Sequence, residues 1–184
     1  MKNTQKLILV AMFAALTAVG AFIKVPIPYV PFTLQYMFCA LAGIVLGSRL
    51  GALSQMIYIS IGLIGIPVFT EGGGINYIFK PTFGYLIGFI IAAYVIGKIR
   101  EKTTKINLSK VVFMLTSGLL FIYLLGVPYL YVISNLYQEK NISFYFAFFY
   151  GFIVCIPGDL ILTLFIAHIS IKLLPMLKIG GYID

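Results

Sequence analysis

Charged side chains are scarce in this sequence, and their scarcity argues against a water-soluble fold. Only 10% of the 184 residues are Asp, Glu, Lys or Arg, whereas 61% are hydrophobic, and the mean hydropathy is +1.07. Soluble domains carry about 25% charged and about 45–50% apolar residues. A surface of this composition suits membrane lipid better than water, so the sequence predicts one integral membrane domain over residues 1–184.

Cysteine and histidine are also scarce, which removes several classes of site. Cys39 and Cys155 lie in apolar runs and are interpreted as small buried hydrophobes, not as a disulfide or a metal site. His168 is the only histidine and has no nearby carboxylate, so neither a metal site nor a proton relay is expected. The sequence offers no Ser/His/Asp, His/Glu/His or paired-aspartate constellation. We therefore expect no enzyme and no cofactor.

Apolar runs, by contrast, are abundant. A membrane-spanning helix needs roughly 17–25 mostly apolar residues, and shorter runs extend into their flanking loops. The first run lacks a small-residue cleavage site and is interpreted as a span, not as a signal peptide. The predicted fold class is an all-α integral membrane protein with six transmembrane helices, at about 7–23, 34–48, 51–66, 83–98, 111–133 and 156–174.

Basic residues are divided unevenly between the predicted loops. If the N-terminus is cytoplasmic, ten lie inside and three outside: Lys2, Lys6, Arg49, Lys98, Arg100, Lys102, Lys105, Lys110, Lys172 and Lys178 against Lys24, Lys80 and Lys140. The positive-inside rule then predicts that both termini are cytoplasmic. The net charge of +8 faces anionic headgroups and is dispersed over short loops, so no nucleic-acid groove is expected.

This orientation places three unusual segments outside. Residues 24–33, KVPIPYVPFT, hold three prolines and are expected to be extended. Residues 144–155 are strongly aromatic, which predicts a segment that lies in the interface or dips back inward. Residues 67–82 gather polar groups, and Glu71 followed by glycines at 72–74 predicts a turn.

Asp159 is the strongest single signal for a site. It opens the last apolar run, directly after Pro157 and Gly158. One interpretation is a helix N-cap, where aspartate accepts backbone N–H bonds. The other is a buried acceptor for N–H groups of a ligand, because ionisable residues at membrane depth usually face a cavity or a partner. Both roles can apply together.

Lys80 is the natural counter-charge to Asp159. It precedes Pro81, which favours the start of a helix, and Thr82 can help to cap that helix. Lys80 either extends its ammonium to the outer interface or binds a ligand carboxylate. Gln35 is a further ligand candidate, whereas Gln55 is expected to bond a neighbouring helix. The remaining candidates for a pocket near the outer face are Asn76, Thr82, Tyr77, Tyr85 and Phe69.

Small residues recur at helical spacing in the first span. Ala11 and Ala15, and then Ala14 and Ala18, form two interleaved small-xxx-small pairs. Such residues let helix backbones approach closely. The pairs serve either packing inside this bundle or docking of another membrane protein.

Several stretches together resemble a known family: VPFTLQ (30–35), LAGIVLGSRLGALSQMIYISIGLIGIPVF (41–69), PTFGYLIGF (81–89) and PGD (157–159). They are similar to the BioY family, the biotin-specific substrate-binding subunits of energy-coupling-factor (ECF) transporters of prokaryotic plasma membranes. The resemblance implies a six-helix bundle with its site near the outer face. The loop between helices 1 and 2 would cover that site, and the loop between helices 3 and 4 would contribute to it.

The resemblance also implies partners. Ala11, Ala14, Ala15 and Ala18 would face a transmembrane coupling protein, and two cytoplasmic ATPase subunits would supply the energy. Biotin would be the cargo: Asp159 would accept from its ureido N–H groups, Lys80 would pair with its carboxylate, and Gln35 or Thr82 would add a neutral hydrogen bond.

One departure from the family pattern keeps the cargo open. Family members commonly carry a lysine three residues after the PGD aspartate, where this chain has Leu162, and many carry a glycine where it has Lys80. The positive charge is hypothesised to have moved to Lys80. The alternative cargo is another vitamin, such as lipoate or thiamine, in the same fold. A membrane enzyme and a purely structural bundle are disfavoured, the latter because it needs no polar mouth.

Overall fold

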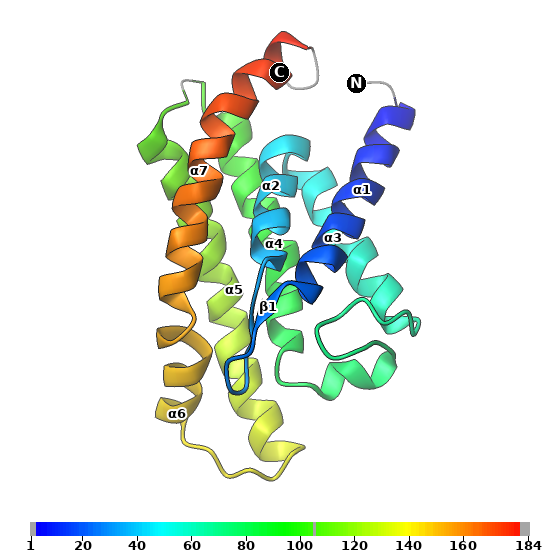
Figure 1. The fold of residues 1–184 in the computed structure, drawn as a ribbon, viewed down its shortest axis with the longest axis vertical. Coiled ribbons are helices and arrows are strands. Elements are labelled where there is room, and N and C mark those ends of the chain that lie inside the picture. The colour runs from blue at the N-terminus through cyan, green and yellow to red at the C-terminus, as the bar shows by residue number, and fades with distance from the viewer. Residues whose placement is uncertain (1–2, 105, 181–184) are drawn as a thin grey trace.

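The computed structural model describes residues 3–104 and 106–180, which form an elongated bundle of helices (Figure 1). α1 begins and α7 ends at the same end of the bundle; the opposite end is called the outer end below. Each of the six predicted spans overlaps one of the helices α1, α2, α3, α4, α5 and α7. In chain order the elements are α1 (Asn3–Phe22), β1 (Lys24–Val25), β2 (Phe32–Thr33), α2 (Gln35–Leu46), α3 (Ser48–Leu63), η1 (Ile75–Phe79), α4 (Phe83–Lys102), α5 (Leu108–Leu136), α6 (Phe144–Phe148), η2 (Phe149–Ile153) and α7 (Ile156–Ile179).

Among the described residues, four helical stretches are long and apolar enough to cross a membrane: α1, α4, α5 and the continuous run Phe144–Ile179. α2 has 12 residues and α3 has 16. At about 1.5 Å per residue, α2 covers only about 18 Å of a hydrocarbon core about 30 Å thick. The two helices therefore form a shorter hairpin inside the bundle.

The turn of this hairpin lies at Gly47, whose φ of 82° is in the left-handed region that favours glycine. Beyond the turn the two helices come very close together. A Cβ added to Gly51 would lie 2.9 Å from the Cα of Gly43, so only small residues allow this approach.

Two adjacent charges on α4 hold the α2–α3 turn. Arg100 donates through Nε to the carbonyl of Ile44 at 2.9 Å and through a terminal nitrogen to that of Val45 at 3.3 Å. Glu101 accepts from the backbone N–H of Ser48 at 2.7 Å and from its hydroxyl at 2.9 Å. A cation thus lies at the C-terminus of α2 and an anion at the N-terminus of α3, as the helix dipoles favour.

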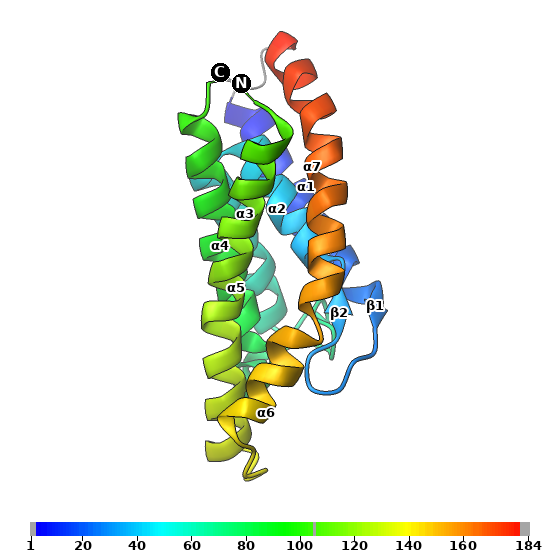
Figure 2. The ribbon, with the colours of Figure 1, turned by 90° about the vertical axis from the view of Figure 1, so that its left-hand side faces the viewer.

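The outer end contains the segments predicted to lie outside (Figure 2). Residues 24–33 form a hairpin in which β1 pairs antiparallel with β2, Lys24 opposite Thr33. The predicted turn after Glu71 is confirmed: Phe69 and Gly72 form an isolated bridge, and Gly72 and Gly74 have φ of 108° and 101°.

The aromatic segment 144–155 is largely helical. It forms α6 and the π-helical turn η2, which lead directly into α7. A helix satisfies its own backbone groups, so the segment needs no irregular dip into the protein. The cysteines behave as expected: Cys39 and Cys155 are buried and unpaired by any disulfide. Gln55 also behaves as expected, since its Nε2 donates to Thr17 of α1 at 3.2 Å.

Candidate functional site

A cavity at the outer end is enclosed by the 24–33 hairpin, the loop before η1 and helices α2, α4, α5 and α7. Most of the surface that its wall exposes is apolar, although about half of the lining residues carry a polar group, and small-molecule sites combine the two in this way. The apolar lining is Val30, Pro31, Phe32, Leu86, Phe89, Leu119, Ile122 and Cys155; the polar lining is Thr33, Gln35, Tyr36, Thr70, Tyr77, Thr82, Tyr85, Tyr123 and Asp159.

Asp159 supplies the one carboxylate among the residues that line this cavity. The hydroxyl of Tyr123 on α5 donates a hydrogen bond to its Oδ2. A carboxylate has about four acceptor positions, so the others are available to donors on a ligand. Capping does not explain this residue, because α7 begins at Ile156 with Cys155 at its N-cap. Asp159 lies one turn further in.

Gln35 faces the cavity from the first turn of α2, and both ends of its amide are bonded. Its Nε2 donates to the hydroxyl of Tyr58 at 2.7 Å. Its Oε1 accepts from the hydroxyl of Thr33 at 3.0 Å. The amide is therefore oriented before any ligand arrives.

A group of three hydroxyls lines the cavity where the loop meets α4. The hydroxyl of Tyr77 lies 2.9 Å from Oγ1 of Thr70 and 3.2 Å from Oγ1 of Thr82. Burial raises the pKa of Tyr77, so this hydroxyl stays protonated at neutral pH. Thr82 occupies the N-cap position of α4, but its side chain makes no capping bond. The predicted capping role of Thr82 is therefore wrong, because its hydroxyl bonds Tyr77.

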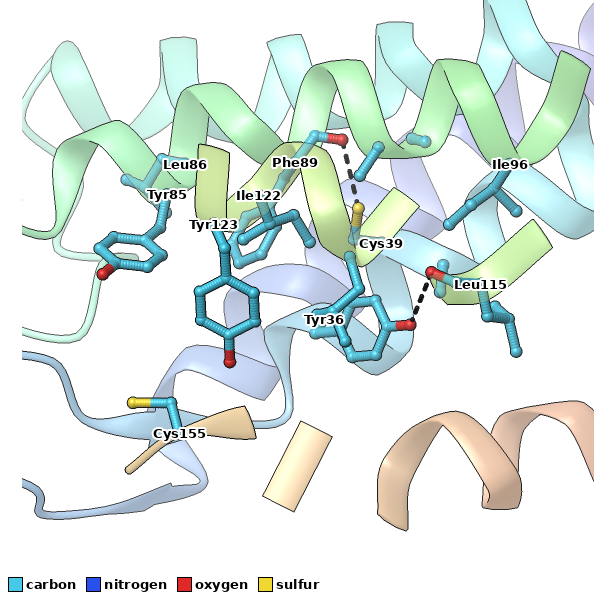
Figure 3. Packing of buried hydrophobic residues seen from close by; sticks show 14 of the residues in the cluster. Tyr36, Cys39, Tyr85, Leu86, Phe89, Ile96, Leu115, Ile122, Tyr123 and Cys155 are labelled. Atoms are coloured by element: carbon cyan, nitrogen blue, oxygen red, sulfur yellow. Dashed lines mark hydrogen bonds between the residues drawn. The ribbon is translucent and has the colours of Figure 1, made fainter. Parts of the chain in front are cut away.

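Tyr85 lines the cavity as predicted, and its hydroxyl donates to the carbonyl of Gly151 at 2.8 Å. The sequence reasoning missed Tyr36, Tyr123 and Cys155. Figure 3 shows Tyr85 and Tyr123 reaching from α4 and α5 toward the segment that carries Cys155. Tyr123 lies inside a spanning run, away from the aromatic belts at the interfaces, and this position was the signal that could have found it. Tyr36 directly follows Gln35 at the outer end of its span, so its neighbour was the signal there.

Three predicted site residues do not line the cavity. Phe69 is 1% exposed and lies behind the wall, with its ring centroid 4.4 Å from that of Tyr77. Asn76 is exposed on η1. Lys80 extends its Nζ to 3.0 Å from Oε2 of Glu71, and both side chains are about half exposed.

Leu162, three residues after Asp159, does not line the cavity. It is partly buried and packs against the hydrophobic core. The lining residues of the cavity accordingly include one carboxylate and no lysine or arginine.

The 24–33 hairpin is attached to its surroundings by Tyr29 and Lys24. The ring of Tyr29 makes an edge contact with Phe146 at 5.2 Å between centroids and lies 5.6 Å from Tyr150. The Nζ of Lys140 lies 5.2 Å from the same ring. Lys24 donates to the carbonyl of Thr70 at 2.8 Å. These contacts keep the hairpin over the cavity.

A second hollow lies between α1 and α3. The side of α1 that lines it consists of Ala11, Ala14, Ala15 and Ala18, and the other residues are Ile57, Tyr58, Ile61 and Val68. Ala11 and Ala15 are exposed, whereas Ala14 is buried. The small-residue pairs therefore form an open groove that internal packing does not fill. We call this hollow the alanine groove.

Comparison with known proteins gives consistent relatives. The model of the BioY family matches residues 1–179. The chain is 48% identical over 172 residues to the probable biotin transporter BioY of Lysinibacillus sphaericus, with 94% of this chain and 88% of that protein covered. It is 38% identical over 173 residues to the biotin transporter BioY of Thermotoga maritima, covering 92% and 95%.

A solved structure matches the fold as well. The crystal structure of the S-component for biotin from an ECF-type ABC transporter superposes with a TM-score of 0.80, at 30% sequence identity and with 94% of each chain covered.

Proposed function

We propose, from the premise that this chain belongs to the BioY family, that it is the biotin-binding subunit of an ECF-type transporter. The observation that carries the proposal is the cavity at the outer end, whose mainly apolar wall holds one carboxylate and a set of neutral donors. Biotin has a neutral ureido ring, an apolar thioether ring and a valerate carboxylate. The cavity offers a carboxylate acceptor, apolar walls and neutral donors that would suit these three parts.

Asp159 would accept hydrogen bonds from the ureido N–H groups. Its carboxylate lies in the first turn of α7 and accepts a hydrogen bond from Tyr123. A hydrogen bond to a charged group contributes about 1.5–3 kcal/mol net. Gln35 would add a neutral hydrogen bond, and Tyr85 together with the apolar residues of α4 and α5 would enclose the rings.

The valerate carboxylate would bind at the three hydroxyls of Thr70, Tyr77 and Thr82. These hydroxyls line the cavity and can donate to an anion. Lys80 would act on biotin only through long-range electrostatic attraction of its carboxylate, because the ammonium of Lys80 pairs with Glu71 in this structure.

The alanine groove would receive the transmembrane coupling protein, because exposed small residues let a second helix approach closely. Two cytoplasmic ATPase subunits would supply the energy, and this chain would act as a binding subunit with no enzymatic step and no cofactor. The membrane would be a prokaryotic plasma membrane. The basic-residue asymmetry supports cytoplasmic termini, and the cavity would then open on the extracytoplasmic side.

Ligand binding by the purified protein tests the proposal. In detergent or nanodiscs we expect titration calorimetry to give a high affinity for biotin, and we expect excess lipoate or thiamine not to displace radiolabelled biotin. Tighter binding of lipoate or thiamine than of biotin would instead support the same fold with a different cargo. Mass spectrometry of any small molecule that co-purifies provides an independent identification.

A further inference from the structure

We propose that Tyr58 is a positioning residue for the ligand, because its hydroxyl determines which atoms of the Gln35 amide face the cavity. This inference rests on the proposed function. Tyr58 itself does not line the cavity. It lies on α3 with 1% of its surface exposed, and its ring lines the alanine groove.

Val68, Tyr58, Gln35 and Thr33 are linked by a chain of hydrogen bonds, and its geometry fixes which group donates and which accepts. The hydroxyl of Tyr58 lies 3.2 Å from the carbonyl oxygen of Val68 and 2.7 Å from Nε2 of Gln35. A carbonyl can only accept, and a tyrosine hydroxyl has a single proton. That proton goes to Val68, so the oxygen of Tyr58 must accept from Gln35.

The same logic fixes the other end of the amide. With Nε2 on Tyr58, Oε1 is directed to the hydroxyl of Thr33, which donates at 3.0 Å. Turning the amide by 180° would put Oε1 beside Tyr58. The single proton of Tyr58 would then face two carbonyl oxygens and could satisfy only one, which is costly at a buried site.

What remains for a ligand is therefore defined. Nε2 keeps a second N–H, and Oε1 keeps one lone pair, and both belong to a side chain that lines the cavity. Because the Gln35 amide cannot rotate freely, it loses little conformational entropy when the ligand binds. Without the hydroxyl of Tyr58 the two amide orientations become closer in energy, and the donor is no longer fixed.

This chain of hydrogen bonds also links the two segments that cover the cavity. Thr33 belongs to the 24–33 hairpin, and Val68 belongs to the loop before η1. The Gln35 donor is consequently fixed only while both segments are in place.

A double-mutant cycle of Tyr58 and Gln35, with biotin affinity as the measured quantity, tests the proposal. We expect Tyr58→Phe to weaken biotin binding about tenfold, since it removes the hydroxyl and keeps the ring that packs edge-on against Phe69. In a Gln35→Leu background, the same change should alter the affinity less than about twofold, because a residue that acts through Gln35 has nothing left to position.

Tyr129→Phe is the matched control. Its hydroxyl also donates to a backbone carbonyl of the outer loop region, that of Ile78, but Tyr129 does not line the cavity. We expect biotin affinity to stay within about twofold of wild type. The proposal would be overturned if Tyr58→Phe lowered biotin affinity equally in the wild-type and Gln35→Leu backgrounds. It would also be overturned if Tyr58→Phe bound biotin with wild-type affinity. Failure of the wild-type protein to bind biotin would instead refute the proposed function.

A second measurement needs no Tyr58 variant. NMR of the wild-type protein, with the side-chain amide of Gln35 assigned by its loss in Gln35→Leu, should show slow hydrogen exchange at Nε2 before biotin is added. Rapid exchange, equal to that of the exposed Asn76 amide, would contradict a fixed orientation.

Discussion

The hydroxyl of Tyr123 on α5 donates a hydrogen bond to the Asp159 carboxylate on α7, and both side chains line the same cavity. The bond joins two helices that approach the cavity from different sides. It leaves the carboxylate with acceptor positions to spare, while the ring of Tyr123 packs edge-on against Phe152. The anion is thus held in place without being neutralised by a cation.

Asp159→Asn should weaken biotin binding about tenfold to a hundredfold, because an amide replaces one acceptor oxygen by a donor and removes the charge. Titration calorimetry measures the change. Glu139→Gln is the matched control, since this carboxylate is exposed in the loop after α5 and should have no effect. An unchanged affinity for Asp159→Asn would exclude this carboxylate as the ureido acceptor.

Lys80→Ala should change biotin affinity less than about fivefold. The ammonium of Lys80 pairs with Glu71 at the surface, and exposed ion pairs contribute about 0–1 kcal/mol. The measurement should be repeated at low and high salt, because a long-range attraction is screened by salt. A loss of tenfold or more would restore the expectation from sequence that Lys80 binds the ligand carboxylate directly.

Ala15→Leu should prevent assembly with the coupling protein and leave biotin binding intact, because the larger side chain fills the alanine groove from an exposed position. Co-purification of the tagged subunit with its coupling protein and ATPases measures assembly. Val19→Leu is the matched control, since Val19 is exposed on the same helix but lies outside the groove. Normal assembly of Ala15→Leu would place the docking face elsewhere.

Tyr29→Ala should increase the rate at which biotin dissociates by roughly tenfold. The substitution removes the ring contacts to Phe146, Tyr150 and Lys140 that keep the hairpin over the cavity, and such contacts contribute about 0.5–1.5 kcal/mol each. Stopped-flow or filter-binding chase experiments measure the rate. If the hairpin does not cover the ligand, the dissociation rate will equal that of wild type.

The sequence predicted the helices well because the apolar runs are long and the proline and glycine residues between them are clear. It also identified Asp159, Gln35, Thr82, Tyr77 and Tyr85, all of which line the cavity. These residues share one property: each lies near the outer end of a predicted span or in the adjoining loop. A polar residue at such a place stands out against its apolar neighbours.

Other parts of the site could not be predicted, because they depend on which face of a helix points inward. Tyr123 lies within a span that is apolar on all sides, so periodicity gives little information about its direction. Phe69 was expected to wall the pocket but packs behind Tyr77, a distinction that requires coordinates. The pairing of Lys80 with Glu71 depends on the path of the glycine turn between them.

The adjacent charges of Arg100 and Glu101 on α4 have a mechanical consequence. Because neighbouring residues seat the end of α2 and the beginning of α3 on one helix, these three helices cannot shear past one another without breaking both attachments. These attachments favour movement of the three helices as one unit if the subunit tilts during a transport cycle. The segments that can move independently of these helices are the proline-rich hairpin and the loop before η1, between which the cargo would pass.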